Sequence, residues 1–258
     1  FSFEDDGELL KISGFTMGTS YEIQFVVKSE NIIKAKIDTK VSGLLEELDR
    51  EVFSTYSPVS ELSRLNQFPI NAPFDSSEYL ANALILARDI SELSNGAFDI
   101  TIGPVVNLWG FGPDFRGNRI GLPSKTQIEK EMLNIGIENL SINGNRSTVI
   151  KTKNITLDLN GIAKGYAVDE VAKLLSELNI DNYFVEIGGE IKLKGLKPGR
   201  LEWLPALEAP VYNDSQVYAV LSSLGEAISL AGSGDYRNYY EVDGVRYSHV
   251  IDPRTGQP

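Results

Sequence analysis

The chain contains no cysteine and only one histidine, His249. The absence of cysteine excludes disulfides, thiolate zinc sites, iron–sulfur clusters and a cysteine nucleophile, while it leaves the cellular compartment open. A single imidazole excludes metal sites that need several histidines. The chemistry of this protein must therefore rest on carboxylates, hydroxyls, amines, main-chain groups and one histidine.

Long apolar runs are also absent, since no stretch approaches the roughly 20 residues that cross a bilayer. Residues 1–6 lack the basic and apolar regions of a signal peptide, so we expect that any export signal was removed or never existed. With 36 acidic against 24 basic residues, the net charge is −12 and the pI is about 4.7. This charge repels nucleic-acid phosphates and predicts no nucleic-acid partner. An anionic ligand would need local help, most simply from a divalent cation.

Three familiar motifs are missing: the P-loop, the glycine fingerprint of Rossmann domains and the His-Glu-x-x-His zinc motif. Their absence excludes P-loop kinases, dehydrogenases and zinc proteases. The 258 residues are 42% hydrophobic with a mean hydropathy of −0.13, which is enough to bury a sizeable core. We find no repeat, low-complexity tract or linker, and therefore predict one α+β domain over residues 1–258.

Apolar periodicity and turn signals indicate the elements of this domain. The three- and four-residue spacing of residues 33–53 predicts a long amphipathic helix, and Asp75 with Glu78 resembles a capping box before a second helix at 80–93. Further helices are expected at 124–136 and 167–178. Hairpins are expected from residues 9–12 with 21–27, 140–142 with 148–150, 183–187 with 191–193, and within 239–250; the stretch 196–215 is expected to be an irregular surface excursion.

An apolar strand predicted at residues 155–159 carries Asp158 and leads into a glycine-bounded loop and a helix. Gly161 and Gly165 can take positive φ and let a ligand approach the backbone, while Lys164 and the helix N-terminus suit a phosphate. Asp158 could point at a metal. The alternative interpretation is an ordinary strand-to-helix turn with a solvated lysine.

Other polar and aromatic residues have two interpretations each. Tyr56 either plugs the core or stacks on a flat ligand from a loop, and Asp99 either accepts a hydrogen bond from a ring edge or caps the turn at Gly96. The aromatic run 109–112 either covers a cofactor or forms a satellite hydrophobic cluster. His249 is either structural or a base or phosphate donor, because histidine side chains exchange protons near neutral pH.

Eight ordered segments together resemble the FAD:protein FMN transferases, the ApbE family. The resemblance runs from about residue 12 to the end of the chain and implies a T-fold-like α+β architecture with a mostly antiparallel sheet and packed helices. The segments that carry it are residues 15–19, 53–56, 60–66, 96–104, 157–166, 187–190, 232–237 and 249–256.

The resemblance implies a magnesium-dependent enzyme. Such an enzyme breaks the pyrophosphate of FAD, transfers FMN to a threonine hydroxyl of an acceptor flavoprotein and releases AMP. It also implies a lipid-anchored precursor in the bacterial periplasm or on the outer face of the cytoplasmic membrane. The alternatives are a magnesium-dependent FAD pyrophosphatase and a non-catalytic flavin-binding protein. Tyr56, which the transferases share, favours transfer.

The resemblance also assigns residues to the expected site. Family members continue with a further strand and a helix whose aspartate and threonine or serine complete the metal site, so we expect that this chain lacks the family's C-terminal segment. The Gly161 carbonyl is implied as a metal ligand, and the catalytic groups near the phosphates are implied to be Lys164, His249 and Asp252. The implied flavin-binding residues are Met17, Tyr56, Ala97, Phe98, Asp99 and Asp158.

Overall fold

The structure is a computed structural model that describes residues 7–28, 34–113, 121–143, 145, 147–210, 216–235 and 238–258. Its contacts group the chain into two compact units, Phe1–Asp49 with Lys164–Ser233 and Arg50–Ala163 with Gly234–Pro258. The prediction of one domain stays a prediction. None of the helices within the described ranges combines the length and the apolar character of a membrane-spanning segment.

The first unit is built on an antiparallel sheet in the order β1-β2-β6-β7-β12. Its first hairpin turns at Met17 and Gly18, which both have positive φ, as tight two-residue hairpin turns require. The predicted hairpins near residues 9–27 and 183–193 are confirmed. The strands are β1 (Glu8–Thr16), β2 (Thr19–Val27), β6 (Tyr183–Ile187), β7 (Glu190–Lys194) and β12 (Ile228–Leu230).

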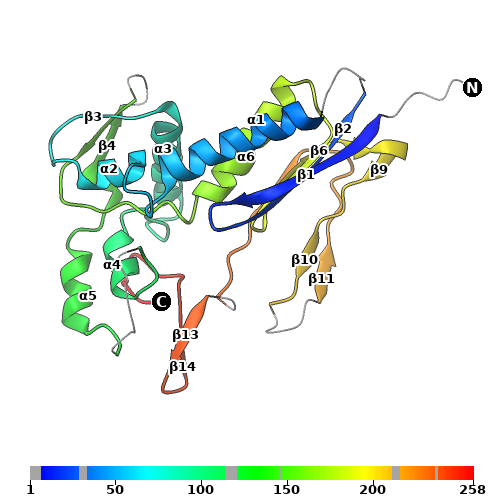
Figure 1. Ribbon diagram of the computed structural model, residues 1–258. Coiled ribbons are helices and arrows are strands. Elements are labelled where there is room, and N and C mark those ends of the chain that lie inside the picture. Colours follow the sequence, from blue (N-terminus) through cyan, green and yellow to red (C-terminus); the bar gives the residue numbers. More distant parts are fainter. Residues whose placement is uncertain are drawn as a thin grey trace, which may run out of the picture. The chain divides into compact units, whose positions relative to one another are not determined.

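Two helices lie along this sheet, α1 (Lys34–Glu46) and α6 (Ala163–Glu177) (Figure 1). α1 buries Ile37, Val41 and Leu45 at four-residue steps, the pattern of an amphipathic helix, and it continues into a π-helical segment, η1 (Glu47–Phe53). The helix predicted at 33–53 is therefore confirmed, apart from residue 33, which lies outside the described residues. α6 begins four residues earlier than the sequence predicted.

The stretch expected to be irregular contains short paired strands. β8 pairs with β9, and β10 pairs with β11, each pair antiparallel. Trp203 is buried with Val26 and Leu193, which attaches this stretch to the sheet of the first unit. Residues 211–215 of the predicted excursion lie outside the described residues. The elements are β8 (Leu196–Lys197), the 3-10 turn η4 (Pro198–Arg200), β9 (Leu201–Glu202), β10 (Ala206–Glu208) and β11 (Val217–Val220).

The second unit has its own small antiparallel sheet in the order β3-β5-β4. The hairpin predicted at 140–150 is confirmed, although Gly144 of its turn lies outside the described residues. The predicted capping box is wrong, because Asp75 is paired within the sheet and Ser77 caps α3 by accepting the Leu80 N–H. The elements are α2 (Glu61–Gln67), β3 (Phe74–Asp75), α3 (Glu78–Leu93), η2 (Ile137–Asn139), β4 (Leu140–Asn143) and β5 (Thr148–Lys151).

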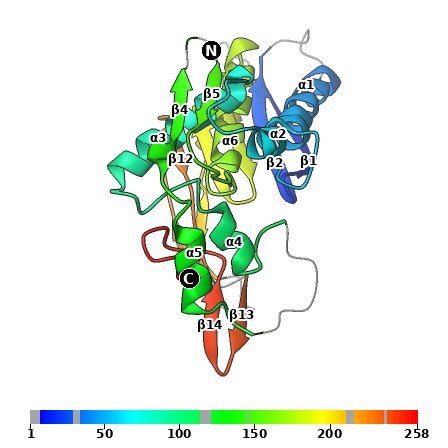
Figure 2. The same ribbon diagram turned by 90° about the vertical axis from the view of Figure 1, so that its left-hand side faces the viewer.

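An aromatic cluster connects the remaining elements of the second unit, whose backbone is drawn in Figure 2. Trp109 is only 2% exposed, packs with Val105 and Ile128, and stacks on Tyr247 with ring centroids 5.5 Å apart. Its indole N–H donates a hydrogen bond of 2.7 Å to the carbonyl of Gly256, 147 positions later. The run 109–112 thus belongs to a hydrophobic cluster. The elements are α4 (Gly103–Leu108), α5 (Lys125–Met132), β13 (Tyr239–Val242) and β14 (Val245–Ser248).

Gly256 allows the chain end to approach α5 closely, and a side chain there should destabilise the fold. Its φ is +68°, and an added Cβ would lie 2.7 Å from Ile128 Cγ2. We expect Gly256→Ala to lower the free energy of unfolding by about 2 kcal/mol through overpacking and backbone strain, measured by urea denaturation. The control is Gly43→Ala, at an exposed helical position with no heavy atom within 4 Å, which should gain up to about 1 kcal/mol. An unchanged urea midpoint for Gly256→Ala would contradict this reading of the contact.

Candidate functional site

The segment 155–159 does not form a regular strand. Within it only Thr156 forms a bridge, parallel with Ile102, so the predicted strand is wrong. The reason is that a side chain takes the place of a neighbouring strand. The N–H of Leu157 donates to Asn66 Oδ1 at 2.7 Å, and the carbonyl of Leu157 accepts from Asn66 Nδ2 at 3.0 Å.

Asp158 is the buried acid of this segment, with 9% of its surface exposed. Its N–H donates to the Ile100 carbonyl at 2.7 Å, and its Oδ1 accepts the N–H of Asn160 at 2.8 Å. Burial raises the pKa of the Asp158 carboxyl, which the hydrogen bond from Asn160 opposes. No basic side chain of the described residues forms an ion pair with it. A carboxyl in this state suits a ligand that brings hydrogen-bond donors or positive charge.

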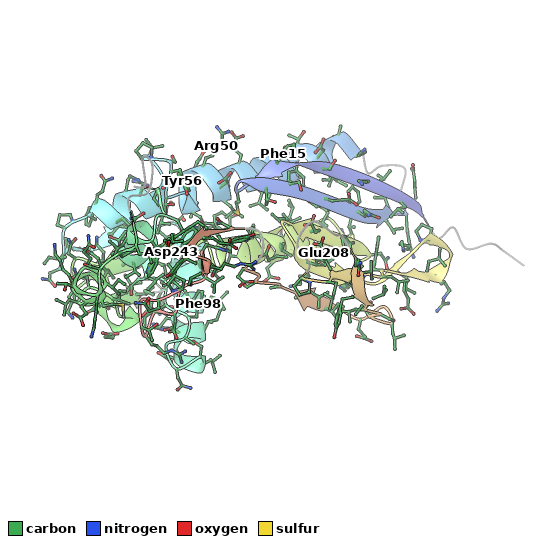
Figure 3. The ribbon with its side chains drawn as sticks, turned by 90° about the horizontal axis from the view of Figure 1, so that it is seen from below. Phe15, Arg50, Tyr56, Phe98, Glu208 and Asp243 are labelled. Atoms are coloured by element: carbon green, nitrogen blue, oxygen red, sulfur yellow. The ribbon has the colours of Figure 1, made fainter. Side chains whose placement is uncertain are left out.

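The predicted flavin-binding segment 97–99 lies beside the loop that follows Asp158. A Cβ added to Gly161 would lie 3.1 Å from Phe98 Cε2, so the Phe98 ring packs against the backbone of Gly161. Figure 3 draws the side chains and labels Phe98. The Asp158 N–H bond to Ile100 joins the same two segments. The structure therefore brings together residues that the sequence placed about 60 positions apart.

Asp99 organises the loop in which it lies. Its Oδ1 accepts the backbone N–H and the hydroxyl of Thr101 at 2.8 and 2.7 Å, and its Oδ2 accepts the N–H of Ile137 at 3.0 Å. The capping interpretation is correct in kind, but the capped groups belong to Thr101 and Ile137 and not to the turn at Gly96. A contact of Asp99 with the flavin stays a prediction.

Ala97 and Asp252 line one pocket of about 440 Å³ in the second unit. Arg254 holds the Asp252 carboxylate through Nε at 2.9 Å and Nη2 at 2.8 Å, and its own N–H adds a third bond. These bonds lower the pKa of Asp252 to about 2, so the group is ionised at neutral pH. The lining residues are Ala97, Val250, Ile251, Asp252, Arg254, Thr255, Gln257 and Pro258.

The exposed ring of His249 contacts a main-chain carbonyl and lies edge-on to the Phe111 ring, with centroids 6.3 Å apart. Its Nδ1 lies 3.0 Å from the Asn238 oxygen, which also accepts the His249 backbone N–H at 3.2 Å. Because a carbonyl can only accept, Nδ1 carries the proton, and Nε2 of the neutral ring is the acceptor nitrogen. No hydrogen bond joins His249 to Asp252 in the described part of the chain, so the two side chains do not form a dyad.

Tyr56 lies on the loop after η1 and is 69% exposed. The interpretation as a core plug is therefore wrong. The Ser54 side chain shapes this loop, because its Oγ accepts hydrogen bonds from the backbone N–H groups of Tyr56 and Ser57 at 3.1 Å each. An exposed phenol ring on an ordered loop is free to stack on a flat aromatic ligand.

Met17 and Lys164 belong to the first unit. The Met17 N–H in the hairpin turn donates to Asp49 Oδ2 at 2.9 Å. Lys164 lies in the first turn of α6, and its Nζ is 3.1 Å from Glu190 Oε1. Gly188, with φ of +59°, leaves room for the lysine, since a Cβ there would lie 3.2 Å from Lys164 Cδ. The Lys164 ammonium is ion-paired and its side chain is 29% exposed, so the role of Lys164 at the phosphates stays a prediction.

The described residues do not form a complete magnesium site. No group of three or more acidic or histidine side chains among them is arranged to hold a metal. Mg²⁺ favours six oxygen ligands, of which Asp158 and the predicted Gly161 carbonyl would supply only a part. The role of Gly161 as a ligand stays a prediction.

Three residues that shape the site had no role predicted from the sequence. Asn66 pairs with Leu157, Glu190 pairs with Lys164, and Arg254 pairs with Asp252. All three lie inside the eight segments that carry the resemblance. Each is a polar residue within such a segment for which no ligand was expected. That combination is the signal that could have identified the three as partners of site residues.

The chain is similar in sequence to known proteins. A sequence model described as the ApbE family matches residues 17–258. A FAD:protein FMN transferase from Vibrio cholerae is 43% identical over 256 residues, which cover 99% of this chain and 75% of the relative.

Two solved structures show the same α+β fold. A variant of the flavin transferase ApbE from Vibrio cholerae gives a TM-score of 0.85 at 41% identity and covers 98% of this chain and 78% of that one. The apo form of the flavinyl transferase ApbE from Pseudomonas stutzeri also gives 0.85, at 37% identity, and covers 97% and 76%. This chain therefore belongs to the ApbE family.

Proposed function

We propose that this protein is a FAD:protein FMN transferase that attaches FMN to a threonine of an acceptor flavoprotein and releases AMP. Relatives that match nearly the full chain carry this name. The single observation that supports it within the fold is the buried Asp158, without a basic partner among the described residues, next to the packed Phe98 and Gly161. A flavin ring offers N–H groups and a flat face, which suit a buried acid and aromatic side chains.

In the proposed reaction the threonine Oγ attacks the phosphorus of the FMN half of FAD. A new P–O bond forms to the acceptor, the bond from that phosphorus to the bridging oxygen breaks, and AMP leaves with this oxygen. The hydroxyl proton moves to Nε2 of His249, which the Asn238 carbonyl leaves free to accept it. Such transfers depend on positioning and on the neutralisation of phosphate charge.

Lys164 is the group that we assign to the phosphates. Without a ligand, the ammonium is paired with Glu190. When a dianion arrives, the long and flexible lysine side chain would let the ammonium turn toward it. Glu190 Oε2 is buried without a hydrogen-bond partner among the described residues, so the carboxylate has a further acceptor available. For the flavin ring we assign the exposed Tyr56 and the loop residue Phe98.

One assay separates this proposal from its alternatives. The full chain is incubated with FAD, MgCl₂ and a purified acceptor flavoprotein, in its natural form and with its target threonine replaced by valine. A mass gain of one FMN on the natural acceptor only, with release of AMP, supports transfer. AMP without the mass gain would indicate a FAD pyrophosphatase, and neither product would leave flavin binding alone. Magnesium dependence stays a prediction from the resemblance, and EDTA should abolish the reaction until Mg²⁺ is restored.

Removing the lysine charge should weaken FAD binding more than it slows chemistry. We expect Lys164→Ala to raise KM for FAD about tenfold with kcat within threefold, because one charge-assisted contact to the phosphates is lost. The matched control is Lys192→Ala, since Lys192 has the same side-chain exposure of 29% and pairs with Asp169 in the same unit. Steady-state kinetics measures both. Equal KM values for the two variants would remove Lys164 from the phosphate site.

The location is part of the proposal. We propose that the protein works in the bacterial periplasm, or on the outer face of the cytoplasmic membrane through a lipid anchor on its precursor. The resemblance is the support for this location. Fractionation of the native cells with an antibody against the protein would test it, and recovery in the cytosol would contradict it.

A further inference from the structure

Asn66 lies near the end of α2, and its side chain makes a connection that the reaction scheme does not use. The amide donates to one main-chain group of Leu157 and accepts from the other, at 3.0 and 2.7 Å. Leu157 is fully buried, so water cannot replace the Asn66 amide as the partner of these main-chain groups. The two residues are 91 positions apart in the chain. An amide that pairs with both groups of one residue does the work of a neighbouring β-strand.

The next residue along the segment is Asp158, the buried acid of the candidate site. Its N–H is held by the Ile100 carbonyl at 2.7 Å, while Leu157 is held by Asn66. Consecutive residues are therefore tied to different partners. With the backbone fixed at both residues, the direction in which the Asp158 side chain leaves the chain is also fixed.

Asn66 is itself held by a buried lysine. Lys151 is only 1% exposed, and its Nζ donates to the carbonyl of Asn66 at 2.6 Å. This carbonyl is one of the last in α2, where a helix leaves acceptors unpaired and a positive charge is favourable. The Lys151 carbonyl in turn accepts the N–H of Asn71 at 2.7 Å, so the chain on both sides of the helix end is attached to β5.

We propose that Asn66, supported by Lys151, is a positioning residue that aims the Asp158 carboxylate at the flavin. This inference rests on the proposed function, because it assumes that Asp158 binds FAD. Asn66 touches neither the flavin nor the phosphates in this scheme. It acts through the backbone of Leu157 and Asp158, and its effect on FAD affinity must disappear when the Asp158 carboxylate is absent.

A double-mutant cycle tests this dependence. Asn66→Asp keeps the acceptor for the Leu157 N–H but turns a second oxygen toward the Leu157 carbonyl, which repels it. The dissociation constant for FAD is measured by quenching of flavin fluorescence for the full chain and for Asn66→Asp, each with Asp158 present and with Asp158→Asn. The control is Gln67→Glu, which makes the same amide-to-carboxylate change at the exposed neighbouring position of α2.

We expect Asn66→Asp to raise the dissociation constant about tenfold when Asp158 is present and less than twofold when Asp158→Asn is present. Gln67→Glu should change neither value. An equal loss in both backgrounds, or an unchanged dissociation constant for Asn66→Asp, would overturn the inference while leaving the proposed function in place. Failure of the unaltered chain to bind FAD would overturn the proposed function itself, and the inference with it.

Lys151→Met provides a second route if Asn66→Asp does not fold. It removes the ammonium and keeps a buried side chain of similar length, so the helix end loses its partner while the Asn66 amide remains. We expect about a threefold rise in the dissociation constant for FAD, which again vanishes in the Asp158→Asn background. A rise of the same size in both backgrounds would show that Lys151 and Asn66 serve the fold alone.

Discussion

We expect the replacement of Asp158 by asparagine to lower kcat/KM for FMN transfer about 100-fold, to raise the dissociation constant for FAD about tenfold and to raise the thermal stability of the ligand-free protein. Asparagine keeps the acceptor for the Asn160 N–H but cannot carry the negative charge that the proposed flavin site would use. The buried carboxylate has no basic partner among the described residues, so its ionised form destabilises the folded state. Function and stability therefore change in opposite directions.

The pH dependence of stability follows from the same burial. The pKa of Asp158 is raised in the folded protein, so the folded state binds the proton more tightly than the unfolded state does. Its contribution to stability is complete below the ordinary aspartate pKa and is lost as pH rises through the raised value. The melting temperatures of the natural protein and of Asp158→Asn should converge in acid and separate towards neutral pH.

Differential scanning fluorimetry between pH 4 and pH 8 measures this separation, and the transfer assay measures the loss of activity. The control is Asp181→Asn, an exposed aspartate paired with Lys194, which should alter activity less than twofold. A variant of Asp158 that transfers FMN at the natural rate would remove this residue from the site. If Asp158→Asn melted at a lower temperature than the natural protein at neutral pH, the carboxylate would stabilise the fold, contrary to this prediction.

We expect His249→Ala to lower kcat for FMN transfer about 1000-fold and to leave the dissociation constant for FAD within threefold. General bases contribute factors of about 100 to 10,000, and the chain offers no second imidazole that could take the proton. The ring is exposed and held by the Asn238 carbonyl, so its removal opens no cavity in the core. Circular dichroism should therefore be unchanged.

Single-turnover measurements with a preformed FAD complex separate this effect from binding. The control is Arg246→Ala on β14, whose guanidinium lies over the Tyr239 ring, because it alters the same hairpin without touching the imidazole. It should keep kcat within twofold. If His249→Ala retained more than a tenth of the natural kcat, the base would have to be sought elsewhere.

The amphipathic helix at 33–53 and the hairpins were predictable because their signals are local. Apolar residues repeat with the period of a helix or a strand, and the turn residues between the strands lie next to them in sequence. The strand expected at 155–159 was wrong for the opposite reason. Its apolar pattern is that of a buried strand, but its partner is the amide of Asn66, and no local pattern reports a partner 91 positions away.

The site was predictable as a set of residues but not as a set of contacts. Motif resemblance placed Phe98, Asp158 and Gly161 in one site, and the structure brings their segments together. The motif resemblance could not show that Lys164 is ion-paired, because its partner Glu190 comes from a hairpin elsewhere in the chain. For Tyr56 the sequence left the core and the loop interpretations both open, since composition alone cannot tell an exposed ring from a core ring at a helix end.

The hydrogen bond from Trp109 to Gly256 closes the chain segment that carries His249 and Asp252 at its far end, while the β13–β14 hairpin closes it at the near end. A segment tied at both ends samples few conformations before any ligand arrives. If substrate binds there as we propose, little conformational entropy would be lost, so more of each new contact would be retained as affinity. In that scheme a core tryptophan would contribute to recognition by limiting the freedom of the segment that it ties down.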